Sequence, residues 1–279
     1  VWRRGTPLAQ ATTVFEAPAS IVEADVWGYA DGARRWSFVD VGRTFFEHEY
    51  RLLLPGGGLA KLPAPAGSDL QDVIDGRVIV KLNRASGRIP AGALVAYSLV
   101  DLAQGRTPAP ELVLAPNARQ AIEEVSASDH VLWVKLLDDV QGRLVALSRG
   151  DDGRWTSAPV ALPANSTVHL AAAAGRQDIA FATVEGMLTP PTLYAVERGA
   201  APCAVQALPA RFDAAGLVVE QFEATSTDGT KIPYFIVHKK GMTPDGSTPT
   251  IMTAYGGFEV PMTPSYAAIT GKLWLERGN

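Results

Sequence analysis

Residues 121–162 read AIEEVSASDHVLWVKLLDDVQGRLVALSRGDDGRWTSAPVAL. Four short segments within this stretch are rich in residues that favour β-strands: Ala121–Ser126, Val131–Leu137, Arg143–Ser148 and Trp155–Leu162. Asp and Gly residues separate the segments, and both tolerate the backbone angles of tight reversals. Four antiparallel strands in a unit of about 40 to 50 residues are typical of one blade of a β-propeller.

Two sequence features repeat with a period near 49 residues. The first is a Leu-Pro or Leu-Ala-Pro sequence, which occurs at intervals of 52, 48 and 46 residues and begins at Leu62, Leu114, Leu162 and Leu208. The second is a short apolar run, which reads LVAYSL from Leu94, LVAL from Leu144 and LYAV from Leu193. We therefore predict a mainly β chain in which residues 1–212 form about four blades, each a four-stranded antiparallel sheet.

A different pattern follows Pro209. Leu217–Ala224 alternates between apolar and polar residues, and a turn at Asp228-Gly229 joins it to a second strand, Ile232–His238. Thr250–Ala254 is short, apolar and rich in β-formers, so we expect a buried strand there.

Two glycines and then a helical pattern come after this expected strand. The sequence continues through Tyr255-Gly256-Gly257-Phe258, and the apolar residues of Ala267–Glu276 have helical spacing. Strand, glycine turn and helix in this order are typical of the start of an α/β layered domain. We assign residues 213–279 to the opening strands of such a domain.

Composition excludes several classes of protein. The 279 residues carry a net charge of −4 without a basic block, which argues against a nucleic-acid partner. Apolar residues make up 47%, but no apolar run approaches the roughly 20 residues of a membrane helix. The single cysteine, Cys203, cannot form an internal disulfide, and its place in an alternating strand predicts a small core residue. The compartment stays open between cytoplasm and periplasm.

The residues that carry hydrolytic chemistry are missing from this chain. No serine has the Gly-x-Ser-x-Gly spacing of a nucleophile elbow, so we expect no Ser/Asp/His triad here. The four histidines, His48, His130, His169 and His238, are expected to be structural or exposed. We predict neither a metal site nor a cofactor.

The stretch from Tyr255 to Phe258 is the strongest functional candidate. Gly256 and Gly257 allow a sharp turn directly after the expected strand. Ligands of open α/β sheets bind at the carboxyl ends of strands. Local physics leaves two interpretations open for Tyr255 and Phe258: contact with a ligand, or packing in the core.

A wider comparison of residues favours the functional interpretation. Residues 227–241 (TDGTKIPYFIVHKKG), Asp245-Gly246-Ser247 and Tyr255–Phe258 resemble the segment with which the prolyl oligopeptidase family of serine peptidases enters its catalytic domain. The resemblance covers about 50 residues, and Thr189–Tyr194 (TPPTLY) is similar to the family's last propeller blade. It implies a seven-bladed propeller that caps an α/β-hydrolase domain, and hydrolysis of short peptides after proline.

The resemblance also implies roles for individual residues. Tyr255 matches a tyrosine whose hydroxyl donates to the oxyanion, and Phe258 matches a phenylalanine that lines the pocket for the residue before the scissile bond. Gly256 and Gly257 match the backbone turn between them. Ala254 departs from the family pattern, because many members carry glycine there, which affects strand geometry and substrate preference.

The family pattern implies that the chain is an internal fragment of a longer serine endopeptidase. It would hold about four of seven blades and the start of the hydrolase domain, with the nucleophile and triad beyond residue 279, so the chain alone is expected to be inactive. Its expected partners are short proline-containing peptides and the remainder of the same protein. Two alternatives stay open: an interaction module with an inactive hydrolase domain, and an oligopeptidase or esterase of other specificity.

Overall fold

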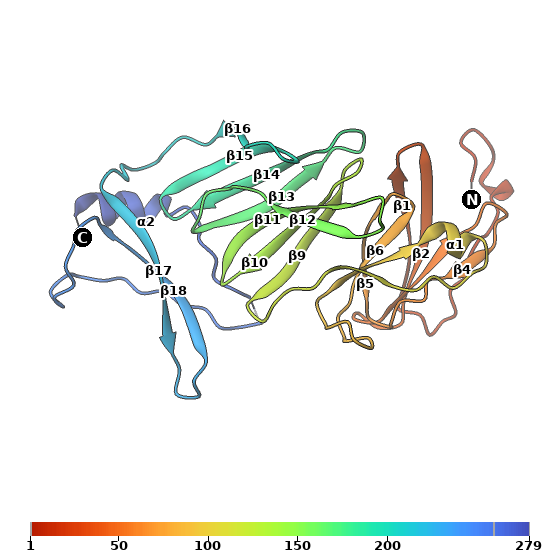
Figure 1. Cartoon of the computed structure of the whole chain (residues 1–279), viewed down its shortest axis with the longest axis horizontal. Coiled ribbons are helices and arrows are strands. Elements are labelled where there is room, and N and C mark those ends of the chain that lie inside the picture. The colour runs from red at the N-terminus through yellow and green to blue at the C-terminus, as the bar shows by residue number, and fades with distance from the viewer. Residues whose placement is uncertain (1, 259, 279) are drawn as a thin grey trace. The chain divides into compact units, whose positions relative to one another are not determined.

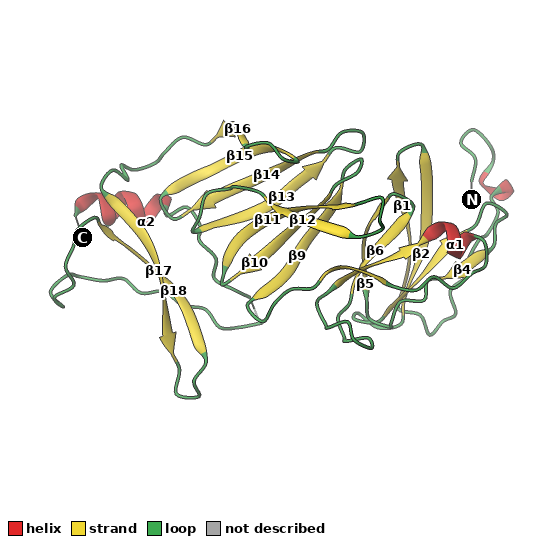
Figure 2. Ribbon diagram, in the orientation of Figure 1, coloured by secondary structure: helices red, strands yellow, loops and turns green. Residues whose placement is uncertain are grey.

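The structure is a computed structural model that describes residues 2–258 and 260–278. Its regular structure consists of four four-stranded antiparallel sheets followed by a two-stranded hairpin (Figure 1). The helices of the described residues are few and short (Figure 2). The predicted fold class, a mainly β chain with about four four-stranded blades, is confirmed.

Each sheet keeps its strands in chain order, so neighbouring strands are joined by simple hairpins. The first sheet contains β1 (Glu23–Asp31), β2 (Arg34–Gly42), β3 (His48–Leu53) and β4 (Leu59–Lys61). The second contains β5 (Asp69–Ile74), β6 (Arg77–Lys81), β7 (Leu94–Ser98) and β8 (Glu111–Leu114). The third contains β9 (Gln120–Ala127), β10 (Leu132–Asp138), β11 (Gln141–Arg149) and β12 (Trp155–Pro159). The fourth contains β13 (Ser166–Ala173), β14 (Ile179–Gly186), β15 (Thr189–Glu197) and β16 (Cys203–Ala207).

The remaining elements are a hairpin and short helices. The hairpin is formed by β17 (Leu217–Thr225) and β18 (Lys231–Lys239), as the sequence predicts. The helices are η1 (Leu8–Gln10), α1 (Leu99–Ala103), α2 (Ala268–Leu273) and η2 (Leu275–Arg277). The last two lie within the region of helical spacing. Among residues 2–258 and 260–278, no helix is long and apolar enough to cross a membrane.

Each repeated sequence feature falls at the same position in every sheet in which it occurs. The apolar runs that begin at Leu94, Leu144 and Leu193 lie in the third strands β7, β11 and β15. The Leu-Pro sequences stand at the end of a fourth strand or within a few residues after it. The period near 49 residues is therefore the length of one blade.

The chain divides into two compact units, and each has its own core. The first unit comprises residues up to Pro116 with Arg149–Trp155 and Gly175–Gln177, and the second comprises the rest. The first core includes Phe38, Leu52, Val73, Val80, Val95 and Tyr97 from the first and second sheets. The second core includes Val131, Trp133, Leu144, Val168, Ala182 and Val184 from the third and fourth sheets. A blade has two apolar faces, so burial requires a neighbouring blade.

In the first unit, a tryptophan ties two sheets together at their first turns. Trp36 on β2 donates its indole N–H to Asp31 Oδ2 at 3.1 Å. The same oxygen accepts the backbone N–H of Gly76 at 2.8 Å, and Gly76 lies in the β5–β6 turn of the next sheet. One carboxylate oxygen therefore joins a core tryptophan to the following blade.

The second unit repeats this arrangement with different chemistry. Trp133 on β10 donates its indole N–H to Ser128 Oγ at 3.0 Å. Ser128 in turn bonds Asp178 Oδ1 at 3.3 Å, and Asp178 immediately precedes β14 of the next sheet. In both units the tryptophan lies five residues after its acceptor, which is a repeat that the strand pattern alone does not reveal.

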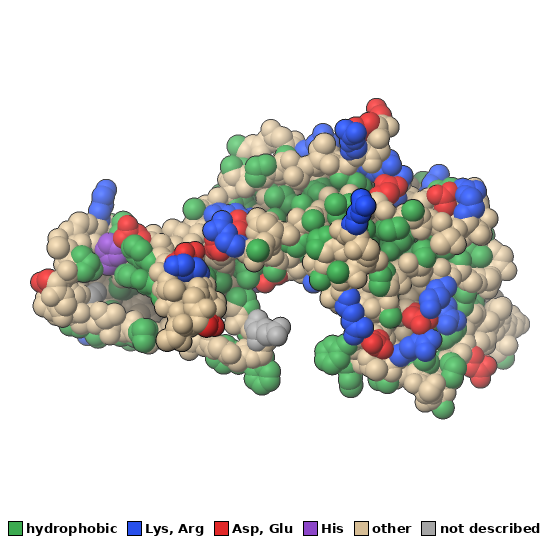
Figure 3. Space-filling model, turned by 60° about the horizontal axis from the view of Figure 1, so that its bottom comes forward, with side chains coloured by type: hydrophobic (Ala, Val, Ile, Leu, Met, Phe, Trp, Pro, Cys, Tyr) green, Lys and Arg blue, Asp and Glu red, His purple; other side chains and the backbone are tan. Residues whose placement is uncertain are grey.

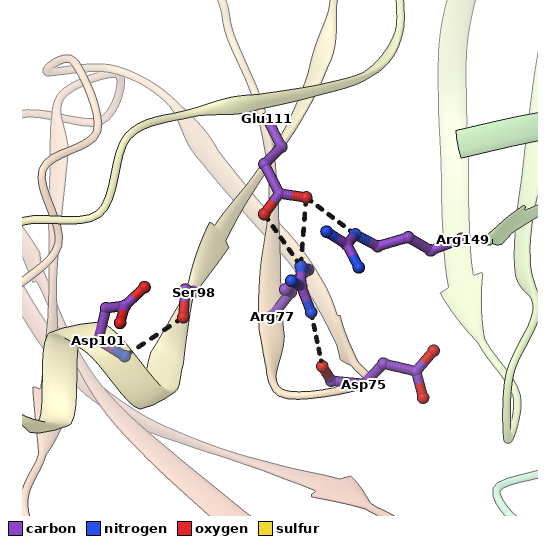
Figure 4. Close-up of polar contacts among 6 residues, drawn as sticks. All are labelled: Asp75, Arg77, Ser98, Asp101, Glu111 and Arg149. Carbon is purple, nitrogen blue, oxygen red and sulfur yellow. Dashed lines mark hydrogen bonds and ion pairs between the residues drawn. The ribbon is translucent and has the colours of Figure 1, made fainter. Parts of the chain in front are cut away.

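An ionic cluster joins distant segments within the first unit (Figure 4). Glu111 on β8 accepts hydrogen bonds from Arg77 Nε at 3.2 Å and from Arg149 Nε at 3.0 Å. Arg77 also donates to the carbonyl of Asp75 at 3.1 Å. Nearby, the Ser98 hydroxyl accepts the backbone N–H of Asp101 and caps α1. The fourth strand of the second sheet is thereby fixed to the turn before β6.

The expectation that Cys203 is a core residue is wrong. Cys203 opens β16, all five of whose residues are exposed. β16 is the outermost strand of its sheet, where neither face is covered, so alternation there does not indicate burial. The boundary between residues 212 and 213 stays a prediction.

We expect a close approach between two sheets to make Gly142 irreplaceable. A Cβ at Gly142 on β11 would lie 2.4 Å from the backbone nitrogen of Val168 on β13. Gly142→Ala should therefore lower the free energy of unfolding by about 1–3 kcal/mol through overpacking. Urea unfolding of the full-length protein measures this change.

The matched control is Gly28→Ala on β1, where an added Cβ would meet no atom within 4 Å. It should be neutral or stabilising by up to about 1 kcal/mol, because alanine restricts the unfolded chain. Equal unfolding midpoints for the two variants would contradict the close approach.

Candidate active site

The predicted site residues Tyr255–Phe258 form an exposed turn. Tyr255 is 55% exposed and Phe258 is 92% exposed, and Phe258 has a left-handed φ of 56°. The Val260 N–H donates to the Gly257 carbonyl at 3.2 Å and closes the turn. The turn thus presents one aromatic ring on each side of two glycines.

The two glycines differ in what the structure requires of them. A Cβ at Gly257 would lie 2.8 Å from the Tyr255 hydroxyl oxygen, so the phenol group lies close over this residue. At Gly256 an added Cβ would meet no atom within 4 Å. Glycine at 257 therefore lets the hydroxyl approach the backbone, whereas the structure gives no steric reason for glycine at 256.

The prediction of a buried strand at Thr250–Ala254 is wrong for this structure. The segment has no regular structure, and its apolar side chains are exposed, Ile251 by 54% and Met252 by 89%. Other hydrophobic side chains also reach the molecular surface (Figure 3). The physical reason is that a strand needs a hydrogen-bonded neighbour, and no strand among the described residues pairs with this segment.

The chain after the turn is fastened to the fourth sheet. Thr167, which is buried at the start of β13, donates its hydroxyl to the Pro264 carbonyl at 2.6 Å. The Tyr266 N–H donates to Glu185 Oε2 at 2.9 Å. The Ala267 N–H donates to the carbonyl of Met187 at 3.1 Å. Three consecutive polar contacts thus fix the path of the chain within ten residues of Tyr255–Phe258.

Aromatic packing strengthens this attachment. The rings of Tyr266 and Phe212 stack with centroids 5.5 Å apart. The Tyr266 hydroxyl accepts the backbone N–H of Arg211 at 2.8 Å. Gly271 of α2 packs so closely on Phe212 that an added Cβ would lie 2.3 Å from the ring. The helix is therefore held against the segment that precedes the hairpin.

The hairpin is anchored through its first strand. Gln221 on β17 donates to the Asp139 carbonyl at 2.6 Å and also bonds the side chain of Gln141. Asn165 donates its side-chain amide to the Val219 carbonyl at 3.2 Å. β17 therefore rests on the β10–β11 turn and on the link between the third and fourth sheets.

The β10–β11 turn that receives Gln221 is strained. Asp139 and Val140 have φ values of 46° and 56°. A β-branched residue rarely adopts this conformation, and such strain costs on the order of 1–3 kcal/mol. Arg119 holds the turn through two groups. Its guanidinium pairs with the Asp139 carboxylate at 2.8 Å, and its backbone carbonyl accepts the Asp139 N–H at 3.2 Å.

An ion pair joins the two strands of the hairpin. His238 Nε2 lies 2.7 Å from Glu220 Oε2, and His238 Nδ1 lies 2.9 Å from the carbonyl of Lys239. The hydrogen bond to Glu220 and then the one to Lys239 raise the pKa of His238 above its ordinary value. The imidazole thus connects the two strands of the hairpin through Glu220.

The remaining histidines also have acidic neighbours. These pairs are His48 with Asp40 at 2.8 Å, His169 with Glu124 at 3.2 Å and His130 with Asp129 at 3.7 Å. Within residues 2–258 and 260–278, no three His, Cys, Asp or Glu side chains gather as metal ligands. The residues that fasten the chain before and after Tyr255–Phe258, above all Gln221 and Thr167, were not identified from the sequence. The sequence holds a weak signal for the role of Thr167, because this residue follows a turn residue, Asn165, and directly precedes the apolar residue Val168. Val168 is buried in the structure.

The fold defines a class of protein: a run of four-stranded propeller blades, continued here by a hairpin and short helices. An uncharacterized peptidase of Sinorhizobium fredii is 36% identical over 290 aligned residues, which cover 100% of this chain and 40% of the relative. A prolyl endopeptidase of Elizabethkingia miricola is 38% identical over 92 residues, which are 33% of this chain and 13% of that protein. No protein-family model matches the chain.

A solved structure extends the similarity to three dimensions. A post-proline cleaving enzyme from Rickettsia typhi aligns over 100% of this chain and 42% of its own, with a TM-score of 0.78 and 27% identity. The chain spans about 40% of the length of the Sinorhizobium relative. The proteins that it matches are peptidases of the prolyl oligopeptidase family.

We expect the Thr167 hydroxyl to control the order of the segment that carries Tyr255. Thr167→Val keeps the shape but leaves the Pro264 carbonyl without its donor, a loss of about 1–3 kcal/mol. Hydrogen exchange in peptides covering residues 250–266 of the full-length protein should become faster. Thr183→Val on the neighbouring strand β14 is the control, and equal exchange in both variants would refute the role of Thr167.

The raised pKa of His238 gives the hairpin a dependence on pH. A folded-state pKa above the unfolded value stabilises the hairpin fully below the unfolded pKa, and this stabilisation is lost as the pH rises through the folded value. NMR titration of labelled histidine in the full-length protein should give a pKa above the ordinary one. Glu220→Gln should lower it, whereas Glu223→Gln on the same strand should not. An unchanged His238 pKa in Glu220→Gln would be the contrary result.

Proposed function

We propose that the whole protein is a serine peptidase that hydrolyses short peptides after proline. The observation that carries this proposal is the similarity along the entire chain to a post-proline cleaving enzyme, at 27% identity and a TM-score of 0.78. The further match to a prolyl endopeptidase supports the same specificity. The Sinorhizobium relative, which matches the whole chain, is a peptidase as well.

In this proposal Tyr255 stabilises the oxyanion. A serine of the remaining protein attacks the peptide carbonyl, the carbon–oxygen double bond opens, and negative charge develops on the oxygen. A neutral phenol donates one hydrogen bond to that oxygen without changing its protonation state. The accessible position of Tyr255, with its hydroxyl close over Gly257, supports this role.

Phe258 contributes apolar surface to the pocket for the residue before the scissile bond. Its ring is 92% exposed, so it has a large area to bury against a proline ring. The left-handed φ at Phe258 directs the chain away after the two glycines. Gly256 and Gly257 provide the backbone turn that separates the oxyanion donor from this apolar contact.

The propeller restricts access by size, and residues 213–279 begin the catalytic domain. This proposal is supported by the way the chain after residue 212 rests on the third and fourth sheets through Gln221 and Pro264. The nucleophile and its acid and histidine come from the remainder of the protein, so the chain alone lacks activity. Short proline-containing peptides are the substrates.

The test is the turnover of the full-length protein on a chromogenic Gly-Pro substrate. Removal of an oxyanion donor costs about 2.7–4 kcal/mol, so Tyr255→Phe should lower kcat by roughly 10²–10³-fold with little change in KM. Tyr234→Phe, at an exposed tyrosine of β18, is the matched control and should keep wild-type turnover. Wild-type kcat in Tyr255→Phe would refute the oxyanion role, and absence of proline-directed cleavage would refute the specificity.

A further inference from the structure

The turn between β2 and β3, residues 43–47, has little apolar anchorage. Its two aromatic side chains, Phe45 and Phe46, are 80% and 85% exposed. Exposed rings bury little apolar surface, so polar contacts have to hold the backbone of the turn. One such contact is Thr44 Oγ1, which accepts the backbone N–H groups of Phe46 at 3.2 Å and Glu47 at 3.0 Å.

His48 directly follows the turn and connects it to the first sheet. Its Nδ1 lies 2.8 Å from Asp40 Oδ1 on β2, and the ring also hydrogen-bonds to the backbone of Phe45. The imidazole packs over Gly42, where an added Cβ would lie 3.2 Å from His48 Cε1. It stacks on the Tyr50 ring, with centroids 6.5 Å apart and an interplanar angle of 20°. The ring is therefore fixed between the turn and the two strands that it joins.

The two hydrogen bonds of this ring require two ring protons to be formed at full strength. The Asp40 carboxylate only accepts, and the bond to the Phe45 backbone raises the pKa of His48, so the ring donates there to the carbonyl. A neutral imidazole carries one N–H, whereas an imidazolium carries two. The protonated ring can therefore serve both acceptors, and the neutral ring cannot.

The charged groups around the imidazole favour the proton. Burial lowers the pKa of His48, whereas the hydrogen bonds to Asp40 and to the Phe45 backbone raise it. The negative charges of Asp40 and of Glu23 on β1 raise it further, so the pKa of His48 lies above its ordinary value. Asp25, also on β1, is hydrogen-bonded to Glu23 and adds a second acidic group on that strand.

A cavity of about 30 Å³ beside the imidazole leaves room for water. Its lining includes His48, Glu49, Tyr50 and Lys61, and a water molecule needs only roughly 10–15 Å³ of such space. The Lys61 ammonium is paired with Glu49 at 3.0 Å, so its positive charge is compensated beside the ring. Burial raises the pKa of Tyr50 to about 12, so the phenol stays neutral while His48 titrates.

We propose that His48 is a pH-sensitive latch for the turn at residues 43–47: the imidazolium holds the turn, and loss of its proton loosens it. Two features support the latch. One ring joins β2 to the turn through two acceptors, and the exposed rings of Phe45 and Phe46 offer no packing to replace a lost hydrogen bond.

The direction of the pH dependence follows from the raised pKa of His48. The stabilisation is complete below the unfolded pKa and is lost as the pH rises through the folded value. The pH therefore sets how firmly the two phenylalanine side chains are held at the surface. The latch does not depend on cleavage after proline, so it and the proposed function fail separately.

Hydrogen exchange of the full-length protein tests the latch without any substitution. Exchange is measured from about pH 5 to about pH 9, a range that brackets the ordinary histidine pKa, and is corrected for the intrinsic rate at each pH. Protection of peptides covering residues 43–48 should fall roughly 2- to 10-fold as the pH rises, which corresponds to the loss of one hydrogen bond. The midpoint should coincide with the pKa of His48 from NMR titration. Constant protection, or a midpoint away from that pKa, would overturn the proposal.

Two variants assign the response to this ring. His48→Gln removes the titrating group, so protection of residues 43–48 should no longer change with pH. Asp40→Asn keeps an acceptor but removes its charge, so the midpoint should move to lower pH. His130→Gln, at an exposed histidine between β9 and β10, is the matched control and should keep the wild-type response. A response that persists in His48→Gln, or an unmoved midpoint in Asp40→Asn, would contradict the latch.

Discussion

The hydrogen bond from the Thr167 hydroxyl to the Pro264 carbonyl fastens the chain to the fourth sheet six residues after the candidate site Tyr255–Phe258. It joins residues 97 positions apart, and Thr167 is buried where it donates. Together with the bonds from Tyr266 to Glu185 and from Ala267 to Met187, this bond fixes the path of the chain that follows Tyr255–Phe258. The fourth sheet thus supports the segment that follows residue 258.

The support depends on the regularity of the blades. Thr167 and Met187 stand at the same end of the fourth sheet because β13 and β14 pair in antiparallel register, with Thr167 opposite Glu185. The close approach at Gly142 keeps β11 against β13, and the bonds around Ser128 hold the third and fourth sheets together at their first turns. A single long segment therefore meets several blade connections at once.

The sequence predicted the strands well because strand patterns are local. Strand-like segments and Asp or Gly turns located β9 to β12 and the hairpin of β17 and β18, and the apolar runs identified third strands. Cys203 and Thr250–Ala254 were misjudged for the same reason. Whether an apolar segment is buried depends on neighbours far along the chain. β16 lies at the edge of its sheet, and residues 250–254 pair with no strand among the described residues.

The residues that hold the candidate site lay beyond sequence reasoning on similar grounds. Gln221 and Asp139 are 82 positions apart, and nothing in either local pattern predicts their contact. The two glycines marked Tyr255 and Phe258 as candidates, and the family resemblance then favoured a functional role for both over packing in the core. Long-range hydrogen bonds are set by the fold, so they become visible only once the blades are in place.

The most direct measurement is a crystal structure of the full-length protein with a peptide aldehyde that ends in proline. The aldehyde mimics the tetrahedral intermediate when a serine adds to it. The account predicts the Tyr255 hydroxyl about 2.7–3.1 Å from the hemiacetal oxygen, with the Thr167–Pro264 bond intact. A Tyr255 hydroxyl directed away from that oxygen, or a segment detached from Thr167, would contradict it.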